Sequence, residues 1–119
     1  MKVDGAAARW NITGNTIYAA DTDNAGGGDG ILVNAGTDIV IDANLIHGNS
    51  TAENGVRLVA GVCIIVNNNR IRGCTNGIAV QSGTDYYTVV GNLTVNNSGS
   101  GVVDAGGQQR PARCSPHCP

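Results

Sequence analysis

Acidic side chains gather in one stretch of the chain, between residues 21 and 29. Asp21, Asp23, Asn24 and Asp29 stand there among glycines, in the sequence DTDNAGGGD. Carboxylate and amide oxygens are the ligands that Ca²⁺ prefers, about six to eight at a time. The stretch therefore predicts a candidate calcium site with Asp21, Asp23 and Asp29 as metal ligands. The alternative is a solvated loop built from turn-forming residues. In that case we expect the chain to require no cofactor.

A second group combines a histidine, a carboxylate and an arginine near later turns. His47 and Glu53 follow one apolar segment, and Arg72 follows the next. In a common groove, a carboxylate or a histidine could take a proton while an arginine neutralises an acidic sugar. Asp42 and Arg57, which lie within apolar segments, join His47 as candidate catalytic residues. The alternative for His47 is a surface residue in an asparagine-rich turn.

A repeat in the sequence indicates which elements position these residues. An asparagine recurs at spacings of 29, 25 and 23 residues, with apolar residues three and five positions before it. A glycine opens a further apolar block in the later copies. Self-similarity at about 20 to 50 residues is typical of solenoids. The columns are Asn15, Asn44, Asn69 and Asn92; Ile12, Ile41, Val66 and Val89; Trp10, Ile39, Ile64 and Tyr87; and Gly30, Gly55, Gly77 and Gly101.

The spacing within each copy predicts short strands. Apolar residues alternate with polar or small ones, as in Ile39 and Ile41, and no segment has helical spacing. Alternation is the period of a strand with one buried face. Since one copy cannot bury its own apolar face, equivalent strands must stack in parallel on the next copy. We therefore expect Trp10, Ile12 and Tyr87 to point inward, and the four repeated asparagines to form a hydrogen-bonded ladder.

The pattern Gly-apolar-x-apolar, a second alternating strand and then Asn-x-Ile-x-Gly resembles the coil of right-handed parallel β-helix proteins. This pectate-lyase-like superfamily includes polysaccharide lyases, some glycoside hydrolases, epimerases and phage tailspikes. The resemblance covers about Trp10 to Gly106 and implies an all-β, right-handed parallel β-helix of about four coils. It also implies a polysaccharide partner and an extracellular or virion-associated location. A β-sandwich is the alternative, but it gives no reason for a repeated asparagine.

The domain organisation follows from where the repeat begins and ends. Residues 1–9 form a lead-in, residues 10–106 the repeats, and residues 107–119 an irregular tail rich in proline and cysteine. No convincing cap covers either end of the stack, so unpaired strand edges are expected there. The chain is therefore expected to be a segment of a longer protein, or to associate with other copies through these ends.

The composition argues against two classes of partner. Charged residues make up 13% of the 119 residues and the net charge is −2, without the basic cluster that nucleic-acid binding requires. No apolar run approaches the length of a membrane span, and the first residues do not resemble a signal peptide. We therefore expect neither nucleic acid nor a membrane as partner.

The sequence also predicts the state of the cysteines and the orientation of Tyr86. Alternation places Cys63 outward and Cys74 at a turn, so we predict that both remain free thiols. Cys114 and Cys118 lie in the tail, where a disulfide or reactive thiols are the alternatives. The other expectations concern the fourth copy, where an extra residue near Gly83 predicts a β-bulge and alternation leaves Tyr86 exposed.

The sequence is compatible with three functions. The first is glycan recognition or a scaffold, along an edge formed by Asp21, Asp23, Asn24, Asp29, Glu53, Arg72 and Tyr86. The second is a polysaccharide lyase, hydrolase or epimerase, for which the resemblance implies acids on a strand face beside an arginine. Asp42 and Arg57 could take those roles, although the other acids of such a cluster are missing. The third is a structural solenoid that associates with itself.

Overall fold

The computed structural model describes residues 1–5, 8–18, 28–48 and 54–107, and within them the chain is entirely β. No stretch of these residues forms an α-helix of the length and hydropathy needed to cross a membrane. The strands are β1 (Lys2–Val3), β2 (Ala8–Thr13), β3 (Thr16–Tyr18), β4 (Asp29–Val33), β5 (Thr37–Asp42), β6 (Leu45–His47), β7 (Asn54–Asn67), β8 (Arg70–Arg72), β9 (Asn76–Val90), β10 (Leu93–Val95) and β11 (Val102–Asp104).

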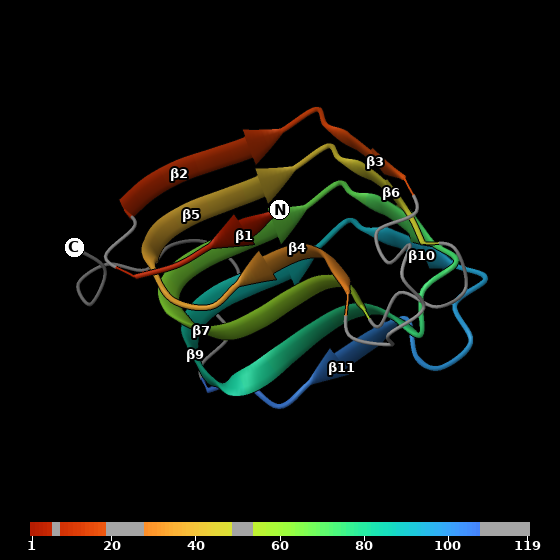
Figure 1. The fold of residues 1–119 in the computed structure, drawn as a ribbon. Coiled ribbons are helices and arrows are strands. Elements are labelled where there is room, and N and C mark those ends of the chain that lie inside the picture. The colour runs from red at the N-terminus through yellow and green to blue at the C-terminus, as the bar shows by residue number, and fades with distance from the viewer. Residues whose placement is uncertain (6–7, 19–27, 49–53, 108–119) are drawn as a thin grey trace.

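The strands stack as rungs on three sides of a parallel β-solenoid (Figure 1). The first side contains β1, β4, the first halves of β7 and β9, and β11. The second contains β2, β5 and the second halves of β7 and β9. The third is a separate four-stranded sheet in the order β10-β8-β6-β3. From β3 to β10 the chain thus makes three turns around the axis. The predicted all-β stack is confirmed, with about three turns in place of the expected four coils.

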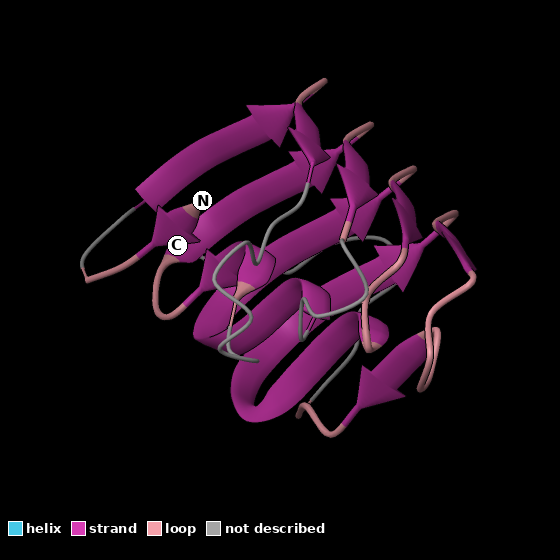
Figure 2. Ribbon diagram, turned by 45° about the vertical axis from the view of Figure 1, so that its right-hand side comes forward, coloured by secondary structure: helices cyan, strands magenta, loops and turns pink. Residues whose placement is uncertain are grey.

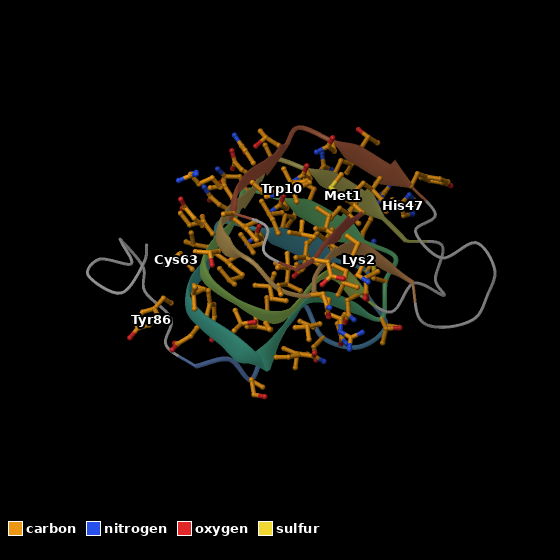
Figure 3. The ribbon with its side chains drawn as sticks, turned by 60° about the vertical axis from the view of Figure 1, so that its left-hand side comes forward. Met1, Lys2, Trp10, His47, Cys63 and Tyr86 are labelled. Carbon is orange, nitrogen blue, oxygen red and sulfur yellow. The ribbon has the colours of Figure 1, made fainter. Side chains whose placement is uncertain are left out.

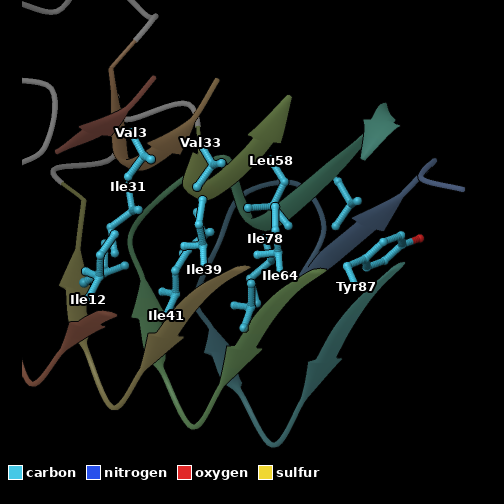
Figure 4. Close-up of a cluster of buried hydrophobic side chains, with 14 of the residues drawn as sticks. Val3, Ile12, Ile31, Val33, Ile39, Ile41, Leu58, Ile64, Ile78 and Tyr87 are labelled. Carbon is cyan, nitrogen blue, oxygen red and sulfur yellow. The ribbon is translucent and has the colours of Figure 1, made fainter. Parts of the chain in front are cut away.

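Columns of aliphatic side chains fill the interior (Figure 4). Ile39 pairs in register with Ile64, and Ile41 with Val66, so the same kind of side chain recurs at each level. Ile39, Ile41, Ile64 and Val66 are fully buried. Burying such a side chain contributes about 1.5 to 3 kcal/mol, so these columns are the main source of stability. The alternation in the sequence predicted them because strands on three sides all turn the same face inward.

The repeated glycines stand where the first and third sides of the solenoid meet. A Cβ atom on Gly55 would lie 2.2 Å from Cγ2 of Ile71, and one on Gly30 would lie 2.7 Å from Cγ2 of Ile46. Real Cβ atoms do not approach other atoms so closely, so only glycine fits at the start of these strands. The glycine column therefore lets the chain turn a corner against the inward isoleucine of the third side.

The predicted asparagine ladder forms at the corner between the second and third sides, where the turns line up in a row (Figure 2). Nδ2 of Asn15 donates to Oδ1 of Asn44 at 3.0 Å, Asn44 donates likewise to Asn69 at 2.9 Å, and Asn69 to Asn92 at 2.9 Å. The residue before each asparagine has a positive φ, between 57° and 71°. This left-handed turn aims every amide along the axis, so the ladder fixes the height of each rung.

A second polar ladder lies one residue before each glycine of the glycine column. Nδ2 of Asn54 donates to Oδ1 of Asp29 at 2.8 Å, and Nδ2 of Asn76 donates to Oδ1 of Asn54 at 3.2 Å. Oδ1 of Asn76 in turn accepts from the backbone of Ser100 at 3.1 Å. This ladder was not predicted from the sequence, although Asp-Gly, Asn-Gly, Asn-Gly and Ser-Gly recur there at the same place in each copy.

The two ends of the solenoid differ from expectation. Val3, within the predicted lead-in, pairs with Val33 and is buried, so the first rung begins at β1. Trp10 was expected inside, but its side chain is 47% exposed (Figure 3). It shares the register of the buried Ile39, yet β2 is the last strand on its side of the sheet within the described residues. Inward orientation alone therefore did not bury Trp10.

At the other end, Tyr87 is buried as predicted, beneath the segment that follows β11. Its hydroxyl donates to Oδ1 of Asp104 at 2.5 Å, and a Cβ on Gly106 would lie 2.6 Å from the ring. The backbone of Gly107 also donates to the carbonyl of Thr84 at 2.8 Å. This segment thus covers part of the end that was expected to lack a cap.

The state of Tyr87 gives a prediction for alkaline pH. Burial, with the hydrogen bond to Asp104, raises the pKa of Tyr87 to about 12. The folded state therefore favours the neutral phenol, and its contribution is complete below about pH 10, the pKa of an unfolded tyrosine, and is lost as pH rises to about 12. We expect one of the three tyrosines to ionise last in an absorbance titration, and this delayed phase to vanish in Tyr87→Phe. Delayed ionisation that persists in Tyr87→Phe would contradict the assignment.

The cysteines correct one prediction and confirm another. Cys74 is free and buried, as a turn residue tolerated in the stack. Cys63 was expected to be a free thiol, and this was wrong, because it is disulfide-bonded. Its side chain is only 4% exposed, although it does not belong to the hydrophobic core cluster. Cys114 and Cys118 lie outside the described residues.

The predicted irregularity in the fourth copy is confirmed. Leu58 pairs with Val80 but Ala60 pairs with Gly83, so β9 contains one more residue than β7 between these pairs. This is the register shift of a β-bulge. Tyr86, three residues after Gly83, was expected to be exposed but is half-buried, with a φ of 52°.

Candidate functional site

The four-stranded sheet of β3, β6, β8 and β10 presents a flat outer face on the third side of the solenoid. The middle residue of each strand, such as Ile46 or Ile71, points into the core. The residues before and after it therefore point outward and form two columns along the solenoid axis. These columns are Thr16, Leu45, Arg70 and Leu93, and Tyr18, His47, Arg72 and Val95. We call these eight residues the outer face.

A shallow hollow of about 130 Å³ lies in this outer face. It spans β6, β8 and β10 and is lined by Leu45, Arg70, Ile71, Arg72, Leu93 and Val95. The side chains of Leu45, Leu93 and Val95 are 38%, 49% and 39% exposed. The hollow thus combines exposed apolar surface with two guanidinium groups.

Both arginines of the hollow are available for a ligand. Arg70 and Arg72 are exposed, and neither takes part in the ion pairs of the described residues, which join Lys2 to Asp4 and Arg57 to Asp29. Each guanidinium carries five N–H donors. None of the eight residues of the outer face is acidic. The face is therefore locally positive on a chain whose net charge is −2.

An aromatic pair extends the outer face beside Arg72. The rings of Tyr18 and His47 meet edge to face, with centroids 4.9 Å apart and planes at 83°. His47 is in register with Arg72 on the neighbouring strand, so the structure places these two predicted residues side by side. Tyr18 is 72% exposed. The half-buried ring of His47 therefore lies on the strand next to Arg72, and the exposed ring of Tyr18 lies one strand further.

The structure does not bring the two strand candidates for catalysis together. Asp42 ends β5 on the second side, where Oδ1 accepts from Nδ2 of Asn68 at 3.3 Å. Arg57 lies near the start of β7 on the first side, with Nη1 3.6 Å from Oδ2 of Asp29. His47 belongs to the third side. The three residues thus occupy three different sides of the solenoid.

The structure does not bring the remaining predicted site residues together either. The side chain of Asp29 is 3% exposed and holds the end of the second ladder. Tyr86 and His47 lie on opposite sides of the molecule (Figure 3). Asp21, Asp23, Asn24 and Glu53 lie outside the described residues, so the calcium site and the predicted loop edge stay predictions. Within the described ranges, no three residues of the metal-binding types come together.

Arg70, the second arginine of the hollow, was not among the predicted site residues. The signal was present, because Arg70 and Arg72 flank Ile71, a residue of an inward column. Alternation about that inward isoleucine places both arginines on one outward face. Leu45, Leu93 and Val95 stand at equivalent positions in neighbouring copies, so the hollow could have been derived from the same alignment.

Comparison with known proteins identifies the architecture. The model of the right-handed β-helix region family matches residues 3–111 of this chain. Among curated proteins and solved structures, the comparisons give no match. The family model covers nearly the whole chain, including every strand of the described residues except the first residue of β1. The chain therefore belongs to the right-handed β-helix family.

Proposed function

We propose that this chain is a polysaccharide-recognition module whose glycan lies on the outer face of the four-stranded sheet. The observation that carries the proposal is the hollow, which places exposed Leu45, Leu93 and Val95 beside two arginines. Carbohydrates present apolar C–H surfaces next to hydroxyl groups, so their sites need apolar contact and a few polar groups. The resemblance to pectate-lyase-like proteins indicates a polysaccharide by analogy of fold.

The rigidity of the outer face supports this function. Each of its strands is short, but β6 and β8 pair on both sides and follow directly after an asparagine of the ladder. The inward Ile46 and Ile71 fix the strands from below. A surface that is already ordered loses little conformational entropy when it binds a ligand.

Recognition without cleavage fits the placement of the acids. Glycoside hydrolysis requires two carboxyl groups on either side of the bond, about 5 to 9.5 Å apart. The outer face supplies apolar, aromatic and cationic groups instead. Asp42 lies on another side of the solenoid, and Asp29 is held in the second ladder.

The proposal is tested by replacing one exposed aliphatic residue inside the hollow and one outside it. Leu93→Gln removes apolar surface at the hollow, whereas Val90→Gln makes the same kind of change on β9, on the second side. The two residues are similarly exposed, at 49% and 54%. We expect Leu93→Gln to weaken binding about four-fold or more, since each buried methylene contributes about 0.8 kcal/mol.

The measurement is the retardation of the full chain in native gels that contain a panel of soluble polysaccharides. Val90→Gln is expected to migrate like the unchanged chain, and no reducing ends or unsaturated products should accumulate. Equal effects of the two substitutions would place the ligand elsewhere. Accumulating products would show that the chain is an enzyme.

A further inference from the structure

We infer that Arg70 and Arg72 form a subsite for an anionic group of the glycan, a carboxylate or a sulfate; this inference rests on the proposed function. The two residues stand on β8, one before and one after the buried Ile71. Residues two apart on a strand point to the same face, about 6.6 Å apart along it. Their long side chains can therefore converge on one group or hold two neighbouring groups.

The charge around the subsite favours an anion over any other ligand. The two arginines repel each other, and no acidic residue of the outer face offsets this repulsion. In contrast, Arg57 has Asp29 as a partner and Lys2 has Asp4. A bound anion would relieve the repulsion, so its binding gains from both guanidinium groups.

The neighbours of the two arginines strengthen such an interaction. Arg70 is in register with Leu45 on one side and Leu93 on the other. Arg72 lies between His47 and Val95. Aliphatic neighbours offer no competing acceptor and lower the local dielectric, which strengthens a charge-assisted hydrogen bond. A planar guanidinium also matches the two oxygens of a carboxylate or sulfate in a way that a lysine ammonium does not.

The outer face also suggests how the rest of the glycan lies. The two columns run along the solenoid axis, across the strands. Neighbouring strands are about 4.8 Å apart, so Leu93, Arg70 and Leu45 follow one another at this spacing. In the second column, Arg72 is followed by His47 and then by Tyr18 on successive strands. A chain that lies along the axis thus meets apolar, cationic and aromatic groups in turn.

The test compares three polysaccharides that differ in their charged groups. Hyaluronan carries carboxylates without sulfate, carrageenan carries sulfates without carboxylate, and dextran is neutral. We expect the full chain to bind one or both acidic polymers at least ten-fold more tightly than dextran. The acidic polymer that binds more tightly identifies the anionic group as a carboxylate or a sulfate.

Single substitutions then assign the effect to the subsite. Arg70→Ala and Arg72→Ala are each expected to weaken binding of the acidic polymer about ten-fold, since a hydrogen bond to a charged group is strong. Arg9→Ala is the matched control, because Arg9 is exposed on β2 and its loss changes the net charge equally. Arg70→Lys should retain part of the affinity. All these side chains are exposed, so unchanged thermal unfolding should confirm that each variant folds.

Different failures lead to different conclusions. If Arg9→Ala weakens binding as much as Arg70→Ala, net charge alone governs binding and the subsite is wrong. If dextran binds as tightly as the acidic polymers and Leu93→Gln still weakens it, the proposed function stands and the anionic subsite fails. If none of the three polymers binds, both proposals fail.

Discussion

Replacement of Asn69 by alanine is expected to lower the free energy of unfolding by about 3 to 5 kcal/mol. Asn69 is 1% exposed and stands in the middle of the ladder. Its Oδ1 accepts from the backbone N–H of Asn44 and from its side-chain amide, both at 2.9 Å. Its Nδ2 donates to the carbonyl of Ile41 at 3.0 Å and to Asn92 at 2.9 Å.

The size of this loss follows from the groups that alanine leaves behind. Asn44 is itself buried, so the backbone N–H that Asn69 satisfies cannot turn to water instead. A buried donor or acceptor that loses its partner costs about 1 to 3 kcal/mol. Asn69→Ala leaves at least one such donor and one such acceptor, and it adds a cavity between two rungs.

Urea unfolding followed by circular dichroism measures the effect. Asn67→Ala is the matched control, because Asn67 ends β7 two residues before Asn69, is half-buried and points outward. We expect the control to stay within about 0.5 kcal/mol of the unchanged chain. If Asn69→Ala does not fold at all, Asn15→Ala at the half-buried end of the ladder should cost about 1 kcal/mol and fold. Equal stability of Asn69→Ala and Asn67→Ala would refute a structural role for the ladder.

The fold could be predicted because each copy repeats the same physical requirement. Asn44 and Asn69 are needed at one corner, and Gly55 is needed at another, where a Cβ would meet Ile71. Such requirements recur in every rung, so the same residue types recur in columns when the copies of the repeat are aligned with one another. Even the bulge before Gly83 was visible, since one extra residue must be accommodated in a stack of fixed register.

The errors fall where the repeat does not apply. Trp10 occupies an inward column, but burial also needs a rung on each side, and β2 pairs only with β5 among the described residues. The free thiol predicted for Cys63 was wrong, because it is disulfide-bonded. A periodic pattern contains no information on which cysteines are bonded.

The candidate site was predicted only in part for a related reason. His47 and Arg72 were recognised as neighbours because they occupy the same place in successive copies. Arg70 and the exposed Leu93 were not, because no catalytic or metal-binding motif includes them and only the register of the strands brings them together. The hollow depends on both, since its lining is mostly aliphatic. A ligand surface of this kind is found by listing the outward residues of each strand.

The number of rungs bears on self-association through the ends. The first side of the solenoid has β1 below β4 and β11 above β9, one rung more than the other two sides in the described residues. A second copy stacked in register on the last rung would bring its β1 to the place of β11. Extension into a continuous stack therefore requires one of these strands to move.

Gly55→Ala is expected to lower the free energy of unfolding by about 3 kcal/mol or more. This lies at the upper end of the range for substitutions that overpack a core. Its Cβ would lie 2.2 Å from Cγ2 of Ile71 and 2.7 Å from the carbonyl oxygen of Gly77. Ile71 is 1% exposed and cannot turn away into solvent. The carbonyl belongs to the backbone of the next rung, so relief requires β8 or β9 to shift.

Gly14→Ala is the control, because its φ of 71° also disfavours alanine but its Cβ would meet no atom within 4 Å. We expect this change to cost only about 1 to 2 kcal/mol, the penalty of the left-handed conformation alone. Thermal or urea unfolding of both variants separates the two effects. A cost for Gly55→Ala no larger than that for Gly14→Ala would show that the corner can relax without strain.

The clash at Gly55 also connects the corner to the outer face. Ile71 lies between Arg70 and Arg72, so a β8 strand displaced by the new methyl group carries both guanidinium groups with it. At temperatures where Gly55→Ala is still folded, its affinity for the preferred polysaccharide should fall together with its stability. Gly14→Ala leaves β8 in place and should bind as the unchanged chain does. Full affinity in folded Gly55→Ala would mean that the position of β8 does not set the geometry of the hollow.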